Sequence, residues 1–198
     1  MSSGSSATHS YMVLGLQRSG TTFTQRIIEK NTSLELDDRA WKHSLPPIDT
    51  DAHKILVTKH PYNWASSIVT RHRVDVMAKW DTYGLLHPGP SMWRDINLQN
   101  LMHLWNHWNA AWIREDVHHI KYEDLLSRPF NTLKRFGVVN NVDVMLPPDT
   151  CVSTGRFSIT DDAKRDYVSY SVNVRVAEQL NKYIDRTLLA QLGYKLVE

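Results

Sequence analysis

Two apolar runs along the chain have the length of buried β-strands. The first covers Tyr11 to Leu16 with one interruption at Gly15, and the second covers residues 54–58, KILVT. Each run ends in a short polar turn, and after each turn apolar residues recur at the spacing of an amphipathic helix. Strand, turn and helix therefore occur twice in succession, which predicts a parallel sheet with helices packed on its faces.

The same pattern predicts the remaining elements. Residues 34–44 mix apolar and polar side chains without a clear period and indicate a short strand or a turn. A turn is expected to begin at Glu123-Asp124. Residues 79–95 and 140–155 are expected to be loops. Helices are expected over residues 22–30, from Pro61 towards Val76, over 96–113, from Pro129 to about Phe136 and over 172–192, and a strand over 117–122.

The expected helix over residues 96–113 carries a stripe of large side chains. They recur every three or four residues, which is the spacing of one helix face. Such a stripe is more often core packing than a binding surface, so we expect it to be buried. Its members are Leu98, Leu101, Trp105, Trp108 and Trp112.

Composition narrows the class of protein. The chain has 198 residues, which suits one α/β domain, and we assign residues 10–198 to it and residues 1–9 to a disordered lead-in. A net charge of +2 is too small to indicate bulk binding of nucleic acid. The sequence has no apolar run long enough to cross a membrane and no secretory signal at its start. The single Cys151 excludes an internal disulfide and fits a reducing compartment, so we expect a cytoplasmic protein. We further expect a monomer or a homodimer.

The segment between the first strand and the first helix has the features of an anion site. Residues 15–22, GLQRSGTT, match the phosphate-binding template G-x-x-x-x-G-K-[ST] except that Thr21 replaces the lysine. Backbone N–H groups of such a loop and the positive end of the helix dipole favour phosphate. The nearest cation, Arg18, lies inside the loop, which argues against ordinary ATP chemistry. The alternative is a tight turn with an incidental arginine.

A second candidate pair follows the second strand. Lys59 ends that strand, and Ser67 lies eight residues further on, about two turns into the next helix. A cation at a strand end and a helical hydroxyl can meet at the sheet edge where α/β proteins bind ligands. Taken alone, the pair fits a solvated lysine and a surface serine better than a ligand site. Beside the first loop, it could hold a second phosphate.

His43 is the leading candidate for a general base. It follows the first helix at a point from which the chain could return to the loop, although a lone histidine is often structural. The other histidines give no metal pattern. His103 and His107 share a helix face without the glutamate that a zincin needs, and His118 and His119 face opposite sides of a strand.

Taken together, these motifs resemble the PAPS-dependent sulfotransferase family. LQRSGTTF is similar to its 5′-phosphosulfate loop, and ILVTKHPYNWASSIV to its 3′-phosphate motif. HIKYEDLLSRPFNTLKRF resembles its Tyr-Glu-Asp-Leu segment, and LLAQLGYKL its common ending. The resemblance implies a single-domain, three-layer α/β/α fold with a central parallel sheet, similar to the P-loop NTPases.

The resemblance also implies a reaction and its residues. It implies transfer of a sulfuryl group from 3′-phosphoadenosine 5′-phosphosulfate (PAPS) to a hydroxyl or amine of a small-molecule or carbohydrate acceptor. The product is adenosine 3′,5′-bisphosphate (PAP), and no metal is required. Arg18 would stabilise the leaving phosphate and His43 would be the base. Donor contacts are expected from Ser19, Gly20, Thr21, Thr22, Phe23, Lys59 and Ser67, with Arg156, Lys164 and Arg165 as possible substitutes for a C-terminal Arg-Lys-Gly element.

Two departures from the family pattern keep alternatives open. Lys59 stands in place of the usual arginine and gives a point charge instead of a bidentate fork. The Arg-Lys-Gly element itself is not recognisable. The alternatives are a P-loop-type kinase of small molecules or nucleotides, and a non-catalytic nucleotide-binding protein on the same fold.

Overall fold

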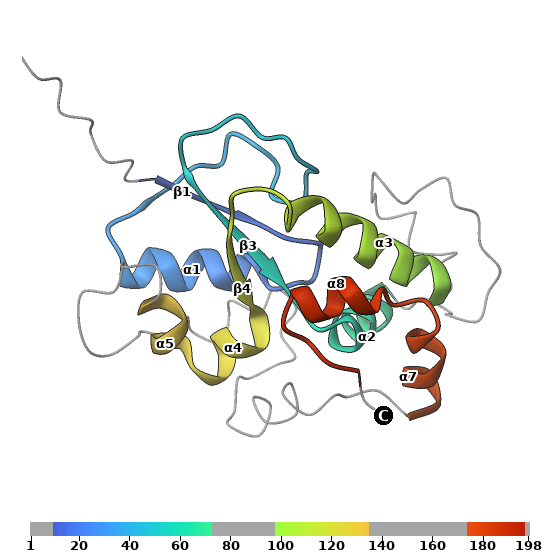
Figure 1. Ribbon diagram of the computed structural model, residues 1–198. Helices are drawn as coiled ribbons and strands as arrows, with labels where there is room; N and C mark the ends of the chain where they lie inside the picture. Colours follow the sequence, from blue (N-terminus) through green and yellow to red (C-terminus); the bar gives the residue numbers. More distant parts are fainter. Residues whose placement is uncertain (1–9, 73–97, 135–173, 197–198) are drawn as a thin grey trace, which may run out of the picture.

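A computed structural model describes residues 10–72, 98–134 and 174–196 of the chain (Figure 1). Strands and helices are interspersed along the chain as far as β4, and the described elements after β4 are all helices. The strands are β1 (Ser10–Leu14), β2 (Glu35–Leu36), β3 (His53–Thr58) and β4 (His118–Lys121). The helices are α1 (Thr21–Asn31), α2 (Pro61–His72), α3 (Leu98–Trp112), α4 (Tyr122–Ser127), α5 (Pro129–Lys134), α7 (Val174–Asn181) and α8 (Arg186–Gln191).

The described strands form one sheet in the order β2-β1-β3-β4, and every pair is parallel. Val13 of β1 lies opposite Ile55 of β3, and Val57 of β3 lies opposite Ile120 of β4. The expected α/β fold with a parallel sheet is therefore confirmed. The apolar runs are continuous rather than alternating because both faces of the sheet are covered, as is usual for parallel sheets.

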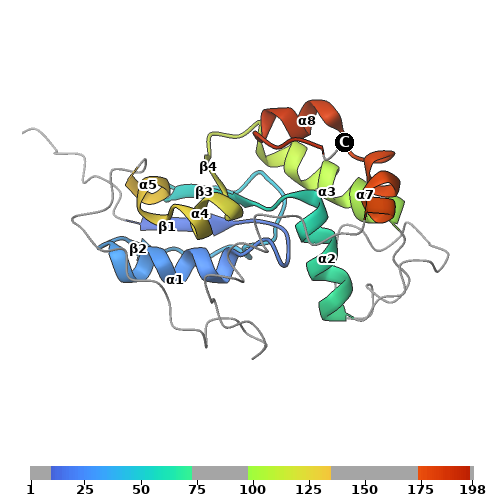
Figure 2. The same ribbon diagram turned by 90° about the horizontal axis from the view of Figure 1, so that it is seen from below.

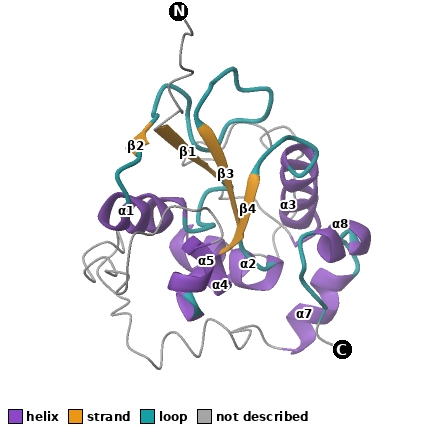
Figure 3. Cartoon of the chain, turned by 60° about the vertical axis from the view of Figure 1, so that its left-hand side comes forward, coloured by secondary structure: helices purple, strands orange, loops and turns teal. Residues whose placement is uncertain are grey.

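Side chains alternate between two separate cores on the two faces of the sheet. On one face, Tyr11, Val13 and Val57 pack against α1, α4 and α5. On the other face, Met12 and Leu56 pack against α2, α3, α7 and α8. Figure 3 shows α1 on one side of the strands and α3 on the other, and Figure 2 shows the same division with α3 and α8 opposite α1.

The tryptophan stripe of α3 lies in the second of these cores. Trp105, Trp108 and Trp112 are buried, with exposed fractions of 1%, 3% and 0%. The expectation that this stripe is core packing is confirmed.

The C-terminal segment corrects one prediction. The single helix expected over residues 172–192 is wrong, because the chain breaks between α7 and α8. Asp185 caps α8 by accepting a hydrogen bond from the Leu188 N–H at 3.0 Å, which is a role that aspartate prefers over a helix interior. Asn106 of α3 fixes the break by donating to the Tyr183 carbonyl at 2.7 Å and accepting from the Asp185 N–H at 3.1 Å.

A second correction concerns Glu123 and Asp124. They do not begin a turn but lie in the first turn of α4, which directly follows β4. Acidic side chains are favourable there because the helix dipole is positive at this end. The expected lead-in at residues 1–9, the loops at 79–95 and 140–155, and Cys151 all lie outside the described residues. No helix in the described part of the chain combines the length and apolar composition needed to span a membrane.

Candidate functional site

The sheet order defines where a ligand can bind. The chain passes from β1 to β2 on one side and then to β3 on the other side of β1. The segments that leave the carboxyl ends of β1 and β3 therefore diverge, and such switch points are where open α/β sheets bind ligands. Residues 15–20 follow β1, and Lys59 follows β3. The two motifs found in the sequence thus meet at the switch point.

The loop after β1 has an unusual backbone. Arg18 has φ 68° and Gly20 has φ 99°, and α1 begins at Thr21. A left-handed conformation is uncommon for a residue with a side chain, and such outliers concentrate at functional sites. The Ser19 N–H closes the turn by donating to the Leu16 carbonyl at 3.0 Å. The strained backbone at Arg18 therefore marks this loop as a functional candidate.

Both glycines of the loop are required by close contacts. A Cβ on Gly15 would lie 2.5 Å from Ser19 Oγ and 2.6 Å from the Val57 carbonyl oxygen. A Cβ on Gly20 would lie 2.2 Å from the Tyr122 ring. The loop is thus pressed against β3 and against the start of α4, which holds its shape.

Two polar atoms of the loop are buried without a hydrogen-bond partner in the part of the chain that the structure describes. Arg18 Nε and Ser19 Oγ make no hydrogen bond to any described residue, and Ser19 is only 1% exposed. Buried polar groups are nearly always hydrogen-bonded, so an unpaired donor in a loop of this shape indicates a ligand. The α1 N-terminus, where Gly20 provides no side-chain cap, adds further N–H groups beside them. This set of donors fits an anion.

Lys59 and Ser67 are brought together, and the solvated lysine that the pair alone favours is wrong because Lys59 is buried. Lys59 Nζ donates to Ser67 Oγ at 2.7 Å, and Ser67 Oγ donates to the Asn63 carbonyl at 2.8 Å. Lys59 is only 3% exposed, and its ammonium lies 5.0 Å from the centre of the Tyr122 ring. Burial lowers the pKa of Lys59 to about 7, Glu123 opposes this shift, and the charge of Arg18 adds to it. A buried lysine at this sheet edge is a second candidate group for binding an anion.

Lys42 and His43 return to the loop. The Gly15 N–H donates to the Lys42 carbonyl at 3.0 Å, and His43 Nδ1 lies 2.5 Å from the Gly15 carbonyl oxygen. Because a carbonyl only accepts, Nδ1 carries the proton and Nε2 is left as the basic nitrogen. Burial lowers the pKa of His43 to about 4. His43 is therefore neutral at pH 7, as a general base must be.

Lys42 is a third cation beside the loop. Its Nζ donates to Thr22 Oγ1 at 2.9 Å, and burial lowers its pKa. The sequence shows that Lys42 precedes the candidate base His43, but it does not predict which residue Lys42 contacts. A lysine reaching the first turn of α1 from another segment adds to the positive charge of the site.

Four buried tryptophans hold the segments of the site. Trp64 Nε1 donates to the Gln17 carbonyl at 2.8 Å, and Trp105 Nε1 donates to the Lys59 carbonyl at 3.0 Å. Trp108 donates to the His43 carbonyl at 3.3 Å, and Trp112 to the Ser44 carbonyl at 2.9 Å. The core tryptophans thus position the loop, the end of β3 and the segment of His43.

Sequence reasoning missed a polar network behind Lys59. Glu123 accepts hydrogen bonds from the His60 N–H, the Asn63 side chain and the Tyr194 hydroxyl. The Tyr194 hydroxyl also lies 3.0 Å from Thr58 Oγ1. The Tyr-Glu-Asp-Leu segment was the one signal that pointed to this region.

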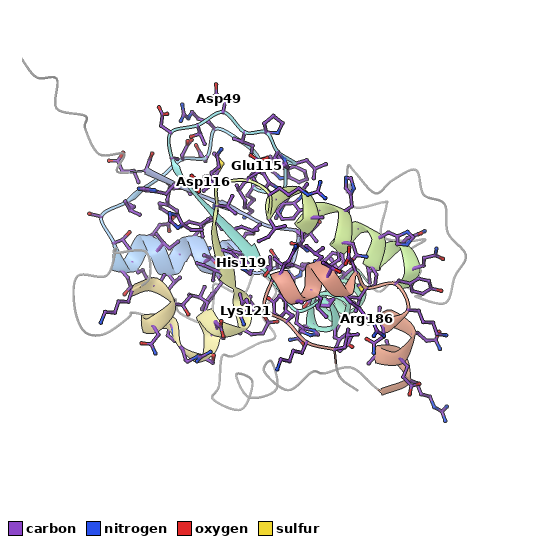
Figure 4. All side chains as sticks on the ribbon, viewed as in Figure 1. Asp49, Glu115, Asp116, His119, Lys121 and Arg186 are labelled. Carbon is purple, nitrogen blue, oxygen red and sulfur yellow. The ribbon has the colours of Figure 1, made fainter. Side chains whose placement is uncertain are left out.

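The network continues along β4 to the C-terminal segment. His119 Nε2 lies 2.7 Å from Thr58 Oγ1, and Lys121 Nζ donates to the Gly193 carbonyl at 3.2 Å. His119 and Lys121 both come from β4 (Figure 4). Burial lowers the pKa of His119 to about 4, so the ring is neutral at pH 7. The C-terminal segment is therefore tied to the carboxyl ends of β3 and β4.

The remaining predicted residues have different outcomes. Phe23 is 6% exposed and packs edge-to-face on Tyr122 at a centroid distance of 5.8 Å, so its expected contact with adenine stays a prediction. Arg156, Lys164 and Arg165 lie outside the described residues. Within the ranges that the structure describes, no group of three or more histidine, cysteine or carboxylate side chains could hold a metal ion.

Comparisons with protein-family models, with curated proteins and with solved structures find no match for this chain. The geometry of the site and the resemblance of its motifs therefore carry the functional argument.

Proposed function

We propose that the protein is a sulfotransferase that moves a sulfuryl group from PAPS to a hydroxyl or amine of a small-molecule or carbohydrate acceptor. The observation that carries this proposal is the contact of Lys59 Nζ with Ser67 Oγ at 2.7 Å, at the same sheet edge as the Arg18 loop. One anion-binding loop would suit many phosphate ligands. Two cation-bearing groups at one switch point suit a nucleotide with phosphates at two positions.

The residues present fit this donor. Arg18 Nε and Ser19 Oγ are buried donors without partners among the described residues, and they suit the 5′-phosphosulfate. Lys59 and Ser67 suit the 3′-phosphate. We also infer that the fold belongs to the P-loop NTPase-like class, because the loop joins the first strand of a parallel sheet to a helix.

Each candidate residue has a defined task in this reaction. When bound, PAPS supplies the sulfuryl group. Arg18 stabilises negative charge that develops on the leaving phosphate, an effect worth about 10²- to 10³-fold in rate for a single well-placed donor. His43 takes the proton of the acceptor hydroxyl at Nε2, because its Nδ1–H is held by the Gly15 carbonyl. The loop and Lys59 keep the donor in place.

The lysine missing after Gly20 supports sulfuryl over phosphoryl transfer. A kinase of P-loop type depends on that lysine at the terminal phosphates of ATP. A sulfuryl group carries less charge, so fixed cations at the leaving phosphate can be sufficient. The single cysteine of the chain supports a reducing compartment such as the cytoplasm.

A transfer assay with ³⁵S-labelled PAPS tests the proposal. The acceptor panel covers phenols, sugars and lipid-like alcohols, and the variants are Arg18→Ala and His43→Ala. Arg186→Ala is the control for Arg18, because Arg186 is exposed at the start of α8 (Figure 4). We expect transfer by the native chain and by the control, and nearly complete loss in both site variants. Binding of PAP without transfer to any acceptor would favour the non-catalytic alternative, and phosphoryl transfer from ATP would favour the kinase.

A further inference from the structure

Glu123 connects three segments at the carboxyl end of the sheet. Its Oε1 accepts from the His60 N–H at 2.9 Å and from Asn63 Nδ2 at 3.0 Å. Its Oε2 accepts from the Tyr194 hydroxyl at 3.1 Å. One carboxylate from the first turn of α4 therefore holds both the turn between β3 and α2 and the C-terminal segment.

The turn that Glu123 holds is the one that carries Lys59 and Ser67. The side chain of Asn63 donates to Glu123, while its carbonyl accepts from Ser67 Oγ at 2.8 Å. Ser67 Oγ in turn accepts from Lys59 Nζ at 2.7 Å. Asn63 thus links the Glu123 carboxylate, through its side chain, to the Ser67–Lys59 pair, through its backbone carbonyl.

The charge of Glu123 also acts on Lys59. Burial is the main cause that lowers the pKa of Lys59 to about 7, Glu123 raises it, and Arg18 lowers it further. The other titratable groups around this turn are His60, whose pKa burial lowers to about 4, and Tyr194, whose pKa burial raises. Near pH 7, both of these are neutral. Among the described residues, Glu123 and Arg18 are therefore the charges that, beside burial, shift the protonation of Lys59.

We propose that Glu123 is a positioning residue that keeps Lys59 and Ser67 arranged to bind the 3′-phosphate of the donor. This inference rests on the proposed function. Glu123 acts through the β3–α2 turn and through its charge, without contact to the donor. The neighbouring Asp124 has a different task, because it pairs with Lys121 at 3.4 Å and with Arg128 at 2.9 Å.

The test compares two nucleotides with Glu123→Gln, which keeps the size of the side chain and one acceptor oxygen. Calorimetry measures the dissociation constants of PAP and of adenosine 5′-monophosphate from pH 6 to 9. We expect PAP to bind about tenfold more weakly at pH 8, because loss of the Glu123 charge lowers the pKa of Lys59 and leaves less of the ammonium form. Binding of the monophosphate stays unchanged. The pH at which PAP binding weakens moves below that of the native chain, a shift that a purely structural role would not produce.

Asp124→Asn is the matched control, because it removes the same charge from the adjacent residue of α4. We expect its PAP affinity and pH profile to equal those of the native chain. Lys59→Arg in the Glu123→Gln background should remove the pH dependence, because guanidinium stays protonated throughout this range. An unchanged affinity and pH profile in Glu123→Gln would overturn the inference while leaving the proposed function intact.

A ligand-free measurement separates the two proposals. The titration of Lys59 is followed by NMR in protein with ¹³Cε-labelled lysine, and Lys59→Arg identifies the signal. We expect a lower pKa for Lys59 in Glu123→Gln than in the native chain, and no change in Asp124→Asn. Equal titrations in all three proteins would overturn the inference. Failure of the native chain to prefer PAP over the monophosphate would instead overturn the proposed function.

Discussion

Lys59 directly follows β3, and Ser67 lies in α2. Lys59 Nζ donates a hydrogen bond to Ser67 Oγ at a distance of 2.7 Å. Lysine is rarely buried unless it is paired, and Lys59 has an exposed fraction of 3%, with Ser67 and the Tyr122 ring as its neighbours. Desolvation of an ammonium is costly unless an anion or several acceptors compensate. This arrangement is the one that the proposed 3′-phosphate site requires.

The Arg18 loop and the Lys59–Ser67 pair should contribute differently to the binding of PAP and of adenosine 5′-monophosphate. Lys59→Met and Ser67→Ala are expected to weaken binding of PAP while leaving that of adenosine 5′-monophosphate unchanged. Arg18→Ala is expected to weaken both, because both ligands have a 5′-phosphate. A lost charge-assisted hydrogen bond costs about 1.5–3 kcal/mol, or about 10- to 150-fold in the dissociation constant. Calorimetry measures each constant, and equal losses for both ligands in Lys59→Met would contradict the assignment.

The hydrophobic pattern was sufficient to predict a parallel sheet covered by helices, with the Arg18 loop and the Lys59 turn at one edge of it. Parallel strands bring their carboxyl ends to one edge, so the two polar turns had to lie close together. The return of His43 to the loop was also predicted, and the contact with Gly15 confirms it.

Partners that are distant in sequence could not be predicted in this way. Periodicity indicates that a tryptophan faces the core but not that its indole donates to a site carbonyl 46 residues away, as Trp105 does to Lys59. The same holds for Glu123, whose partners lie 60 to 71 residues away. The break before α8 was missed because Val176, Leu180, Ile184 and Leu188 keep a four-residue spacing across it.

His43 should govern turnover rather than donor binding. Its folded pKa of about 4 lies below the ordinary value of 6.5, so the neutral base persists until the pH falls through about 4. We expect kcat at saturating donor to lack a transition near pH 6.5. His43→Ala should lower kcat by about 10²- to 10⁴-fold with unchanged affinity for PAP. The control is His107→Ala, since His107 is exposed on α3. A kcat profile with its midpoint near 6.5, or full activity in His43→Ala, would rule out this role.

Trp105 and Trp112 form a matched pair for testing how the core positions the site. Each is buried in α3 and donates one indole hydrogen bond, Trp105 to the Lys59 carbonyl and Trp112 to the Ser44 carbonyl. Replacement by Phe should lower the free energy of unfolding by about 1–3 kcal/mol in both, because a buried acceptor loses its donor. Denaturant unfolding measures this loss. Only Trp105→Phe should also weaken PAP binding, and equal binding in both variants would refute the positioning role of Trp105.

Gly20 should tolerate alanine less than Gly193 does. Both have positive φ, 99° and 72°, so an added Cβ strains either by about 1–2 kcal/mol. At Gly193 the nearest atom to that Cβ is 3.6 Å away, whereas at Gly20 the Tyr122 ring lies at 2.2 Å. Gly20→Ala should therefore lose about 1–3 kcal/mol more than Gly193→Ala in denaturant unfolding. Equal losses would mean that the loop is not held against Tyr122.

The most direct test of the donor site is calorimetric titration of the native chain with PAP in buffer containing EDTA. The account predicts metal-independent binding at least about tenfold tighter than that of adenosine 5′-monophosphate, as one further charge-assisted phosphate contact implies. Equal affinity for the two nucleotides, or binding that appears only for ATP with Mg²⁺, would contradict it.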